Sequence, residues 1–432
     1  MKLALSCLAI LAAASSALAA NSYRMNVHID PLSQALDVSG SFTFTVPADE
    51  TREVTLYLNH AMQLKKAQCK ECAGYNFDQA KTKAYFFAPD ASALVLRFRQ
   101  PLAKGRVVRF DFRYAGKPPT PPSQIGSVGP DWVELALYSA WFPFQPEFGL
   151  FTYDLAVQID KDWLVAGAGT VTGKGSGQWQ LVQPVETMDI NLVASRNLHM
   201  RIVDDGGMPV QIDFVGLDAA AADRIARVCG RSSGQFARWF GPASGRALTV
   251  VVAERSDGGG YGRPGYMCLE RAYTSKLDEK ELSTQLPHEI AHMWWNRGPV
   301  TTWEDWLNES FAEYSSLMFA RETLGQDVFD KRLAEYSKAI AKTPALRGMK
   351  RGDEQSYLAL YWKGSLILNQ VEQRMGKEQF IAFLARLNSD RIRSTDRLLE
   401  ILEQMSSPAT RRELEQMLAT PGAVPAASQA AR

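Results

Sequence analysis

The hydrophobic pattern of the chain changes at about residue 205, and this change constrains the fold more than any other feature. Before it, short segments alternate apolar and polar residues and are rich in β-branched and aromatic side chains, which is typical of strands. Turn residues separate these segments, including a proline-rich stretch at 117–130. Spaced strands without intervening helices predict an antiparallel β-domain. The clearest predicted strands are Tyr23–Ile29, Ser39–Val46, Glu53–Leu58, Ala93–Arg99, Val107–Tyr114 and Tyr153–Ile159.

After about Gly206 the periodicity becomes mainly helical. Leu217–Phe240 has the spacing of an amphipathic helix, Ala247–Val252 is a short β-type run, and helical patterns dominate from Glu279 onward. We therefore expect an α+β protein of two domains. Residues 20–205 would form a saddle- or sandwich-like β-domain, and residues 206–419 a mostly helical domain with a small sheet. The Ala-, Pro- and Ser-rich residues 420–432 predict a disordered tail.

The composition excludes several classes of protein. Hydrophobic residues make up 46% of the chain and charged residues 22%, as in ordinary globular proteins. The 48 basic and 47 acidic residues give a net charge of +1, so no basic field is available to bind nucleic acid. We expect no nucleic-acid partner, and the oligomeric state stays open.

The N-terminus has the three parts of a secretory signal peptide. Lys2 provides the positive region, Leu3–Ala14 the apolar region, and Ala17-Leu18-Ala19 a small-residue cleavage site. The apolar run is shorter than the roughly 20 residues that a membrane-spanning helix needs. Cys7 lies inside this run, which does not suit a lipoprotein. We expect cleavage after residue 19, no transmembrane segment in the mature chain, and a periplasmic or secreted protein.

Four cysteines remain after cleavage, and an oxidising compartment permits disulfides. Cys69 and Cys72 are spaced for a tight local bridge. A redox motif would need a strand-to-helix setting, and a zinc ribbon would need a second such pair. Whether Cys229 and Cys268 pair is left open by the sequence.

The segment His288-Glu289-Ile290-Ala291-His292 carries the chemistry. If Glu281–Trp295 is a helix, the two histidines lie one turn apart on one face and can bind one metal ion. Glu289 would lie close enough to act on a water molecule there. Pro287 would bend the helix or mark its first turn. The alternative is a pair of helix histidines that only pair with carboxylates.

A catalytic zinc site uses three protein ligands and leaves one position open. Glu309 and Glu313 lie one turn apart on the next helical segment, and 16 residues separate His292 from Glu309. One would bind the metal, and the other would accept the second N–H of a ligand histidine. The spacing alone leaves open which of the two binds the metal.

These motifs resemble the aminopeptidase N family of zinc peptidases, which are gluzincins with a thermolysin-like catalytic domain. The family places H-E-x-x-H before a W-L-N-E-G-F-A-type helix whose Glu is the third zinc ligand, matched here by Trp306-Leu307-Asn308-Glu309-Ser310-Phe311-Ala312. The resemblance therefore implies Glu309 as the third ligand, Glu313 as its supporting residue and one Zn²⁺ per chain. The spacing from His292 is two residues shorter than usual, which a shorter loop near 298–302 would absorb. The first half, with Ser139-Ala140-Trp141-Phe142-Pro143, also resembles the family's β-domain. Larger members of the family carry a C-terminal helical-repeat domain, and we expect this chain to be a short member that lacks it.

Tyr361-Trp362-Lys363-Gly364 resembles the family segment whose tyrosine hydrogen-bonds the oxyanion. The resemblance therefore implies a catalytic role for Tyr361. From its helical pattern alone, a plain core tyrosine is the alternative.

The family's G-x-M-E-N segment, whose Glu binds the substrate's α-amine on an edge strand, is altered in this chain. Its nearest match is Gly265-Tyr266-Met267-Cys268-Leu269-Glu270, with Cys268 in place of the Glu. Gly265, Met267 and either Glu270 or Glu134 are the candidate substrate-binding residues. The glycines at 258–260 and Gly265 either pair with an extended peptide or form a loop without a binding role.

The resemblance implies hydrolysis of peptide bonds by a zinc-activated water, with Glu289 as general base and Tyr361 at the oxyanion. We expect aminopeptidase-like activity. The alternatives are endopeptidase-like specificity, because the amine-binding Glu is replaced, and a zinc-loaded peptide-binding protein without turnover. Nothing in the sequence favours another hydrolase, such as an epoxide hydrolase.

Overall fold

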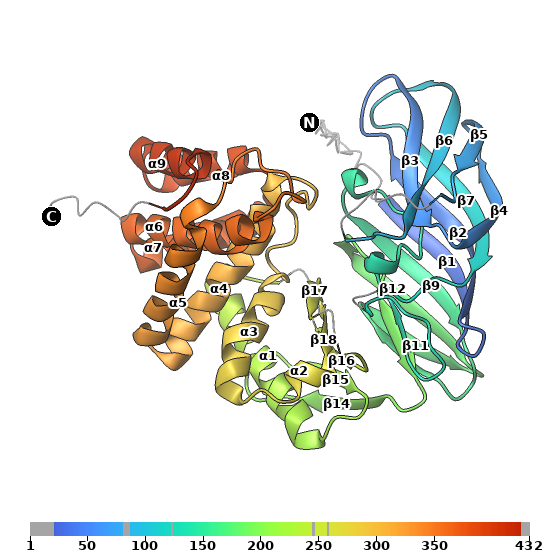
Figure 1. Cartoon of the computed structure of the whole chain (residues 1–432), viewed down its shortest axis with the longest axis horizontal. Coiled ribbons are helices and arrows are strands. Elements are labelled where there is room, and N and C mark those ends of the chain that lie inside the picture. Colours follow the sequence, from blue (N-terminus) through green and yellow to red (C-terminus); the bar gives the residue numbers. More distant parts are fainter. Residues whose placement is uncertain (1–20, 81–86, 122–123, 244–246, 257–258, 425–432) are drawn as a thin grey trace, which may run out of the picture.

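The chain folds into two units that lie side by side, as the computed structural model in Figure 1 shows. The structure describes residues 21–80, 87–121, 124–243, 247–256 and 259–424. The predicted signal peptide and residues 425–432 of the predicted tail lie outside these ranges. Within them, no helix is both long and apolar enough to span a bilayer.

The first unit is built from strands, as the alternation predicts. Its largest sheet has the order β11-β12-β9-β1-β2-β7-β4, and two three-stranded sheets have the orders β3-β6-β5 and β10-β13-β8. Most neighbours are antiparallel, but β1 and β9 pair in parallel. The strands are β1 (Asn21–Asp30), β2 (Ala35–Thr45), β3 (Thr51–Asn59), β4 (Met62–Cys69), β5 (Cys72–Phe77), β6 (Ala91–Leu102), β7 (Val107–Gly116), β8 (Val133–Leu135), β9 (Phe151–Gln158), β10 (Leu164–Gly167), β11 (Thr170–Gly175), β12 (Gln178–Thr187) and β13 (Leu192–Ser195).

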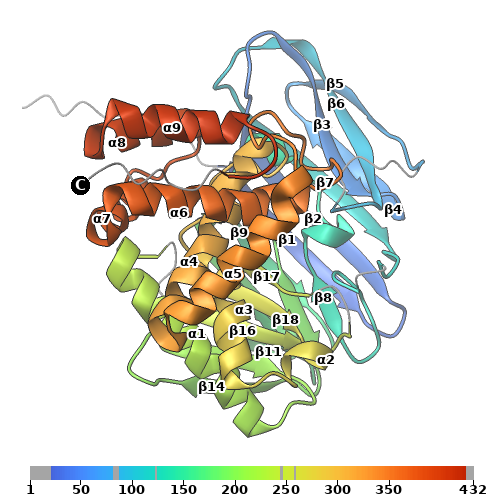
Figure 2. The same ribbon diagram turned by 60° about the vertical axis from the view of Figure 1, so that its left-hand side comes forward.

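The second unit is a five-stranded sheet followed by helices. The sheet has the order β14-β15-β16-β18-β17, and its edge strand β17 contacts helix α3. Figure 2 shows helices α6 to α9 stacked at the end away from β14. The elements are β14 (His199–Val203), β15 (Val210–Phe214), α1 (Ala219–Phe240), β16 (Leu248–Ala253), β17 (Tyr261–Arg263), β18 (Tyr266–Glu270), α2 (Arg271–Thr274), α3 (Glu279–Ala291), α4 (Trp306–Leu324), α5 (Gln326–Ala339), α6 (Gly364–Met375), α7 (Lys377–Ser389), α8 (Thr395–Met405) and α9 (Pro408–Ala419).

The predicted α+β class with two domains is confirmed, but two boundaries move. Strand β14 begins at His199 and pairs with β15, so the second unit starts before residue 206. Residues 420–424 are also not a frayed tail. The Lys363 Nζ donates to the Thr420 carbonyl at 2.6 Å, and the Gly422 N–H donates to the Thr343 carbonyl at 2.8 Å. These bonds hold the end of the described chain on the helical unit.

Among the described residues, two cysteines form a disulfide and two are free thiols. Cys69 and Cys72 form a disulfide between β4 and β5, as their spacing predicts. Cys229 on α1 and Cys268 on β18 are both buried and are not bonded to each other. Cys229 packs in the core of the second unit, whereas Cys268 belongs to the cluster that joins the two units. Cys229 and Cys268, whose pairing the sequence left open, therefore do not form a second disulfide.

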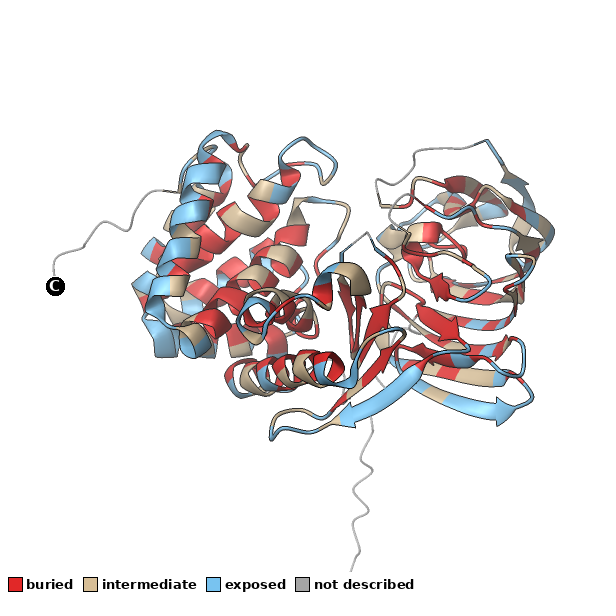
Figure 3. Cartoon of the chain, turned by 60° about the horizontal axis from the view of Figure 1, so that its bottom comes forward, coloured by how far each residue is buried: buried red, intermediate tan, exposed pale blue. Residues whose placement is uncertain are grey.

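The two units share a buried interface. Small and apolar residues of the β10-β13-β8 sheet, such as Ala166 and Val193, cluster with Val251, Ala253 and Cys268 of the second unit's sheet. Figure 3 shows that the strands at this junction are buried, while the outer faces of the helices are exposed. Burial of this apolar surface stabilises one arrangement of the two units. The relative position of the two units is therefore fixed by the fold.

A pH dependence of stability follows from Asp213 on β15. Burial raises the pKa of Asp213 to about 6, despite a 2.8 Å hydrogen bond from the Gln211 amide. Because this folded pKa exceeds the unfolded value, the protonated carboxyl stabilises the protein below about pH 4, and this contribution is lost as the pH rises through 6. We expect Asp213→Asn to raise the free energy of unfolding at pH 7.5 by up to about 3 kcal/mol.

Urea unfolding of the Asp213→Asn variant at pH 4, 5.5 and 7.5 measures this effect. The gain should shrink toward zero at the lowest pH. Asp111→Asn, at an exposed position on β7, is the matched control. An equal effect of Asp213→Asn at all three pH values would contradict the assignment.

Candidate metal centre

Helix α3 presents both histidines of the H-E-x-x-H segment. It begins at Glu279, two residues earlier than predicted, because Asp278 and Glu281 form a reciprocal capping box with hydrogen bonds of 2.9 and 2.8 Å. Pro287 lies inside the helix and not at its first turn. The helix ends at Ala291, with His292 as the capping residue, so the predicted extension to Trp295 is too long.

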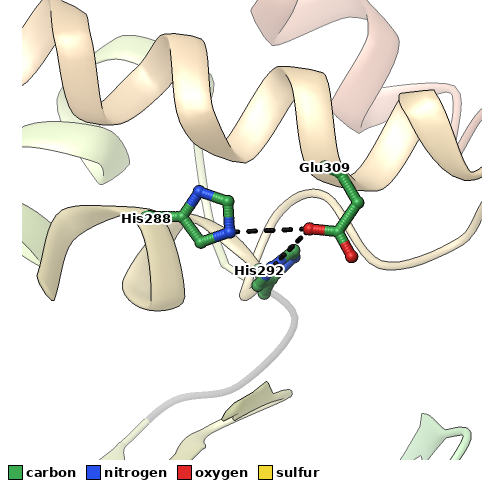
Figure 4. A group of neighbouring side chains, drawn as sticks. All are labelled: His288, His292 and Glu309. Atoms are coloured by element: carbon green, nitrogen blue, oxygen red, sulfur yellow. Dashed lines mark ion pairs between the residues drawn. The ribbon is translucent and has the colours of Figure 1, made fainter. Parts of the chain in front are cut away.

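The third predicted ligand comes from α4, which packs against α3. The Glu309 Oε2 lies 3.5 Å from the Nε2 of His288 and 3.5 Å from the Nε2 of His292. One ligand atom from each of the three residues lies within 4.8 Å of the others. Figure 4 shows the carboxylate directed at both imidazoles. The structure therefore brings together the three residues that the sequence selected.

This geometry fits a tetrahedral zinc ion. Zinc–nitrogen and zinc–oxygen bonds of about 2.0–2.1 Å at tetrahedral angles place two ligand atoms roughly 3.3 Å apart, which is near the 3.5 Å separations seen here. Within the described part of the chain, Glu309 Oε2 is buried and accepts no hydrogen bond. A buried carboxylate is costly without compensating positive charge, and a cation supplies that charge. The donor set of two imidazoles and one carboxylate is that of a catalytic zinc site.

The surrounding charges also favour a cation. Burial alone would raise the pKa of Glu309, but the two histidines hold this pKa well below its usual range. Burial alone would lower the pKa of His288, but Glu309 and Glu313 raise it well above its usual value. A pocket that stabilises positive charge on an imidazole against desolvation has a negative potential. That potential stabilises a divalent ion at the same place.

Further hydrogen bonds orient both imidazoles. The His288 Nδ1 lies 2.8 Å from Glu313 Oε2, as expected for the supporting residue, and the Tyr336 hydroxyl donates to the other oxygen of Glu313. The His292 Nδ1 lies 2.9 Å from the Trp295 carbonyl. With a proton on each Nδ1, both Nε2 lone pairs point toward Glu309 and are available to a metal.

Tyr361 lies beside the predicted ligands. It belongs to a π-helix, η5 (Leu358–Lys363), and its ring stacks on His288 with centroids 5.4 Å apart. Single π-helical turns are frequent at functional sites. Gly364 allows the chain that follows Tyr361 to lie close to α4, because a Cβ at this position would lie 1.7 Å from the Ser310 Oγ of α4. The Tyr-x-Lys-Gly spacing thus has a packing reason.

An arginine that the sequence analysis did not select completes this wall. The Arg351 guanidinium lies 2.6 Å from Asp305 and 3.5 Å from Glu309, and it donates to the Tyr361 hydroxyl at 3.4 Å. It is largely buried, and so is Asp305. Arg351 reaches the centre from a loop ten residues before Tyr361 and belongs to no local motif. No sequence signal could therefore have identified it.

The centre opens into a cleft of about 510 Å³ between the two units. Strand β17 forms one wall, and Gly262 brings its backbone against α3, because a Cβ there would lie 2.4 Å from the Glu289 carbonyl. Arg263 donates to Asp189 at 3.0 Å and to the Tyr138 hydroxyl at 3.3 Å. Glu289, the predicted general base, lines the same cleft.

The predicted substrate-binding residues require correction. The segment 265–270 is not the edge strand beside the metal, because β18 lies between β16 and β17. Met267 points into the core of the second unit, and Gly265 only forms the turn before β18, with φ of +72°. Glu134 is fully buried, 3.1 Å from Arg255, and does not line the described cleft. Of the four candidates, Glu270 alone lines the cleft as described. Its role stays a prediction.

Two imidazoles and a carboxylate on neighbouring helices, with a glutamate between the histidines, define a zinc metallopeptidase centre. Residues 261–420 match the Peptidase family M1 domain. The part of the chain that carries the metal centre is therefore similar to an M1-type zinc peptidase domain, which agrees with the resemblance to the aminopeptidase N family.

Solved structures share the fold of the chain. An M1 zinc metallopeptidase from Deinococcus radiodurans has a TM-score of 0.72 at 18% identity, with 96% of each chain covered. A variant of it bound to Tyr-Ser-Ala has a TM-score of 0.71 at 19% identity, covering 94% of this chain and 95% of that one. A two-domain M1 zinc metallopeptidase variant bound to L-tryptophan has a TM-score of 0.72 at 19% identity and the same coverage. A search of curated proteins gave no match.

The contact between His288 and Glu313 predicts a change in metal affinity. Glu313→Ala removes the acceptor that fixes the His288 tautomer, so we expect zinc to bind about 10- to 100-fold more weakly. Competition with a chromophoric chelator measures this affinity without reference to activity. Glu322→Ala, at an exposed position on the same helix, is the matched control. Equal affinity of the Glu313→Ala variant and the unaltered protein would contradict the supporting role.

Proposed function

We propose that this protein hydrolyses peptide bonds as an aminopeptidase-like zinc enzyme that acts outside the cytoplasm. One observation carries the proposal. The His288, His292 and Glu309 ligand atoms converge within 4.8 Å in a cleft that Glu289 and Tyr361 also line. A purely structural zinc site is closed by four protein ligands and needs no base, whereas this site opens to a cleft.

The metal ion and the protein side chains would perform different parts of the reaction. A zinc ion held by the two histidines and Glu309 would supply a Lewis acid for the scissile carbonyl and for the attacking water. Glu289 takes the proton of that water on a carboxylate oxygen and then delivers a proton to the leaving nitrogen. The Tyr361 hydroxyl donates a hydrogen bond to the developing oxyanion. Arg351 donates a hydrogen bond to that hydroxyl and so helps to fix its position.

The shape of the cleft suits an extended peptide. One edge of β17 pairs with β18, and its other edge faces the cleft beside α3. A peptide that aligns with this free edge would be positioned by backbone hydrogen bonds, in the manner of strand addition. Leu150, Met188 and Tyr138 of the first unit also line the cleft. Both units therefore contribute to substrate binding.

A separate question is whether the enzyme cleaves next to a free N-terminus or at an internal peptide bond. An aminopeptidase needs a carboxylate for the free α-amine, and Glu270 is the predicted candidate that lines the cleft. The endopeptidase alternative has specific support, because the edge strand reads Tyr261-Gly262-Arg263 and offers no carboxylate next to the metal. Arg263 is itself paired with the buried Asp189. Discrimination between a charged N-terminus and an internal bond depends on such a group.

The disulfide between Cys69 and Cys72 supports the proposed location outside the cytoplasm, because such bonds persist in oxidising compartments. The leader at residues 1–19 has the pattern of a signal peptide. A periplasmic or secreted chain that begins at Ala20 is the expected product, and N-terminal sequencing of the exported protein checks it.

The assignment of Glu289 predicts a separation of metal binding from turnover. Glu289→Gln should keep one zinc per chain and lower kcat at least about 100-fold, because only the proton acceptor is removed. Fluorogenic peptides with free and with blocked N-termini, assayed with and without chelator, measure the activity. Cleavage only of free peptides indicates an aminopeptidase, and cleavage of blocked ones an endopeptidase.

The matched control is Glu279→Gln, at a partly exposed position on the same helix where the side chain pairs with Arg231. It should cleave at the unaltered rate. Cleavage by the Glu289→Gln variant at the unaltered rate would show that another residue is the base. Absence of cleavage of every peptide by the zinc-loaded, unaltered protein would favour a peptide-binding protein without turnover.

A further inference from the structure

Two additional hollows open from the catalytic cleft on the side of His292. One, of about 460 Å³, lies between residues 144–151 of the first unit and the loop 296–302. The other, of about 590 Å³, lies between residues 184–186, 240–243 and 385–391. Leu150 and Asn296 line the cleft and both hollows, so the three spaces meet there. The Asn296 amide donates to the His292 carbonyl at 2.7 Å, which fixes this junction next to the metal centre.

Arginines surround the junction. Arg297 follows Asn296 in the chain and lines both hollows, while Arg393 lines the first and Arg391 the second. Arg391 and Arg393 share one carboxylate, that of Glu186, at 2.8 and 3.6 Å. The charged residues among the described linings of the two hollows are Arg297, Arg391, Arg393, Glu147 and Glu186.

The positive charges of Arg391 and Arg393 act on Arg297, and the carboxylate of Glu186 partly offsets them. Burial, together with Arg391 and Arg393, lowers the pKa of Arg297 to about 10, so the group is still charged at neutral pH. Arg297 donates to the neutral Trp294 carbonyl at 3.2 Å and to the Asn388 side-chain oxygen at 3.4 Å. The cleft itself carries acidic residues such as Glu270 and Glu289. The junction thus differs in charge from the rest of the substrate path.

We propose that Arg297, Arg391 and Arg393 form a subsite for a carboxylate of the peptide substrate, so that the enzyme selects acidic peptides. Guanidinium groups suit this ligand because they bind carboxylates through two parallel hydrogen bonds. The carboxylate is that of an Asp or Glu side chain or of the peptide's C-terminus. The proposal rests on the peptidase function above and adds a preference that the zinc centre alone does not supply.

The distance along the chain limits where the carboxylate lies in the substrate. Arg297 is five residues from His292. An extended chain covers at most about 3.6 Å per residue, so the two Cα atoms lie within roughly 18 Å of each other. An extended peptide covers the same distance with about five residues. The selected carboxylate therefore lies within about five residues of the scissile bond.

A scan of quenched fluorescent peptides tests the subsite. A single Glu is moved through about five positions on each side of the scissile bond, and each peptide is paired with its Gln counterpart. C-terminally amidated versions separate a side-chain carboxylate from the terminal one. We expect the carboxylate to raise kcat/KM about tenfold at one position or more. This ratio should fall toward unity in the Arg391→Gln/Arg393→Gln protein and should shrink at high salt.

Arg109→Gln, at an exposed position on β7 far from the cleft, is the control that should keep the ratio. A ratio of one at every position in the unaltered enzyme would overturn the subsite while peptide hydrolysis stands. A preference that survives the double substitution would overturn it as well.

Binding of the same peptides to the zinc-loaded Glu289→Gln protein separates the subsite from the proposed activity. Tighter binding of the Glu peptides supports the subsite even if no peptide is cleaved by the unaltered protein. Equal binding of the Glu and Gln peptides, with an unaltered enzyme that cleaves both equally, would leave the function in place and remove the subsite.

Discussion

The structure depends on one buried carboxylate held between two imidazoles. Glu309 is directed at His288 and His292 because α3 and α4 pack side by side, and each helix has local reasons for its position. The capping box at Asp278 fixes where α3 begins, and Gly364 lets the π-helix and α6 pack closely on α4. A carboxylate in such a place is costly unless positive charge compensates it, and a divalent cation is the compensation that leaves the histidines neutral.

Around this centre, the chain uses buried ion pairs to fix the walls of the cleft. Glu134 with Arg255, and Asp189 with Arg263, join residues of the first unit to the segment after β16 and to β17 of the second. Removing one partner of such a pair is costly, because it leaves an uncompensated buried charge. These groups therefore position β17 against α3, and Glu134 acts through structure and not by touching substrate. The edge strand β17 and the residues around Asn296 both line the space open to a substrate.

The sequence could predict what is encoded locally. The two-domain α+β organisation follows from the change in periodicity, and the histidine pair and Glu309 follow from helical spacing. Strands such as β5 and β11 were not predicted, because they are short and mostly exposed and lack the alternation of a half-buried strand. Arg351 and the arginines at 297, 391 and 393 meet only through tertiary packing. The edge strand was misplaced because a three-residue strand with a glycine carries almost no periodic signal.

Zinc-edge X-ray absorption on the purified, processed protein tests the central claim most directly. The account predicts one zinc per chain with nitrogen and oxygen neighbours at about 2.0–2.2 Å and no sulfur neighbour near 2.3 Å. The signal should disappear from a Glu309→Ala sample that has passed through the same buffers. A protein that holds no stoichiometric zinc, or a zinc ion bound by sulfur, would contradict the account.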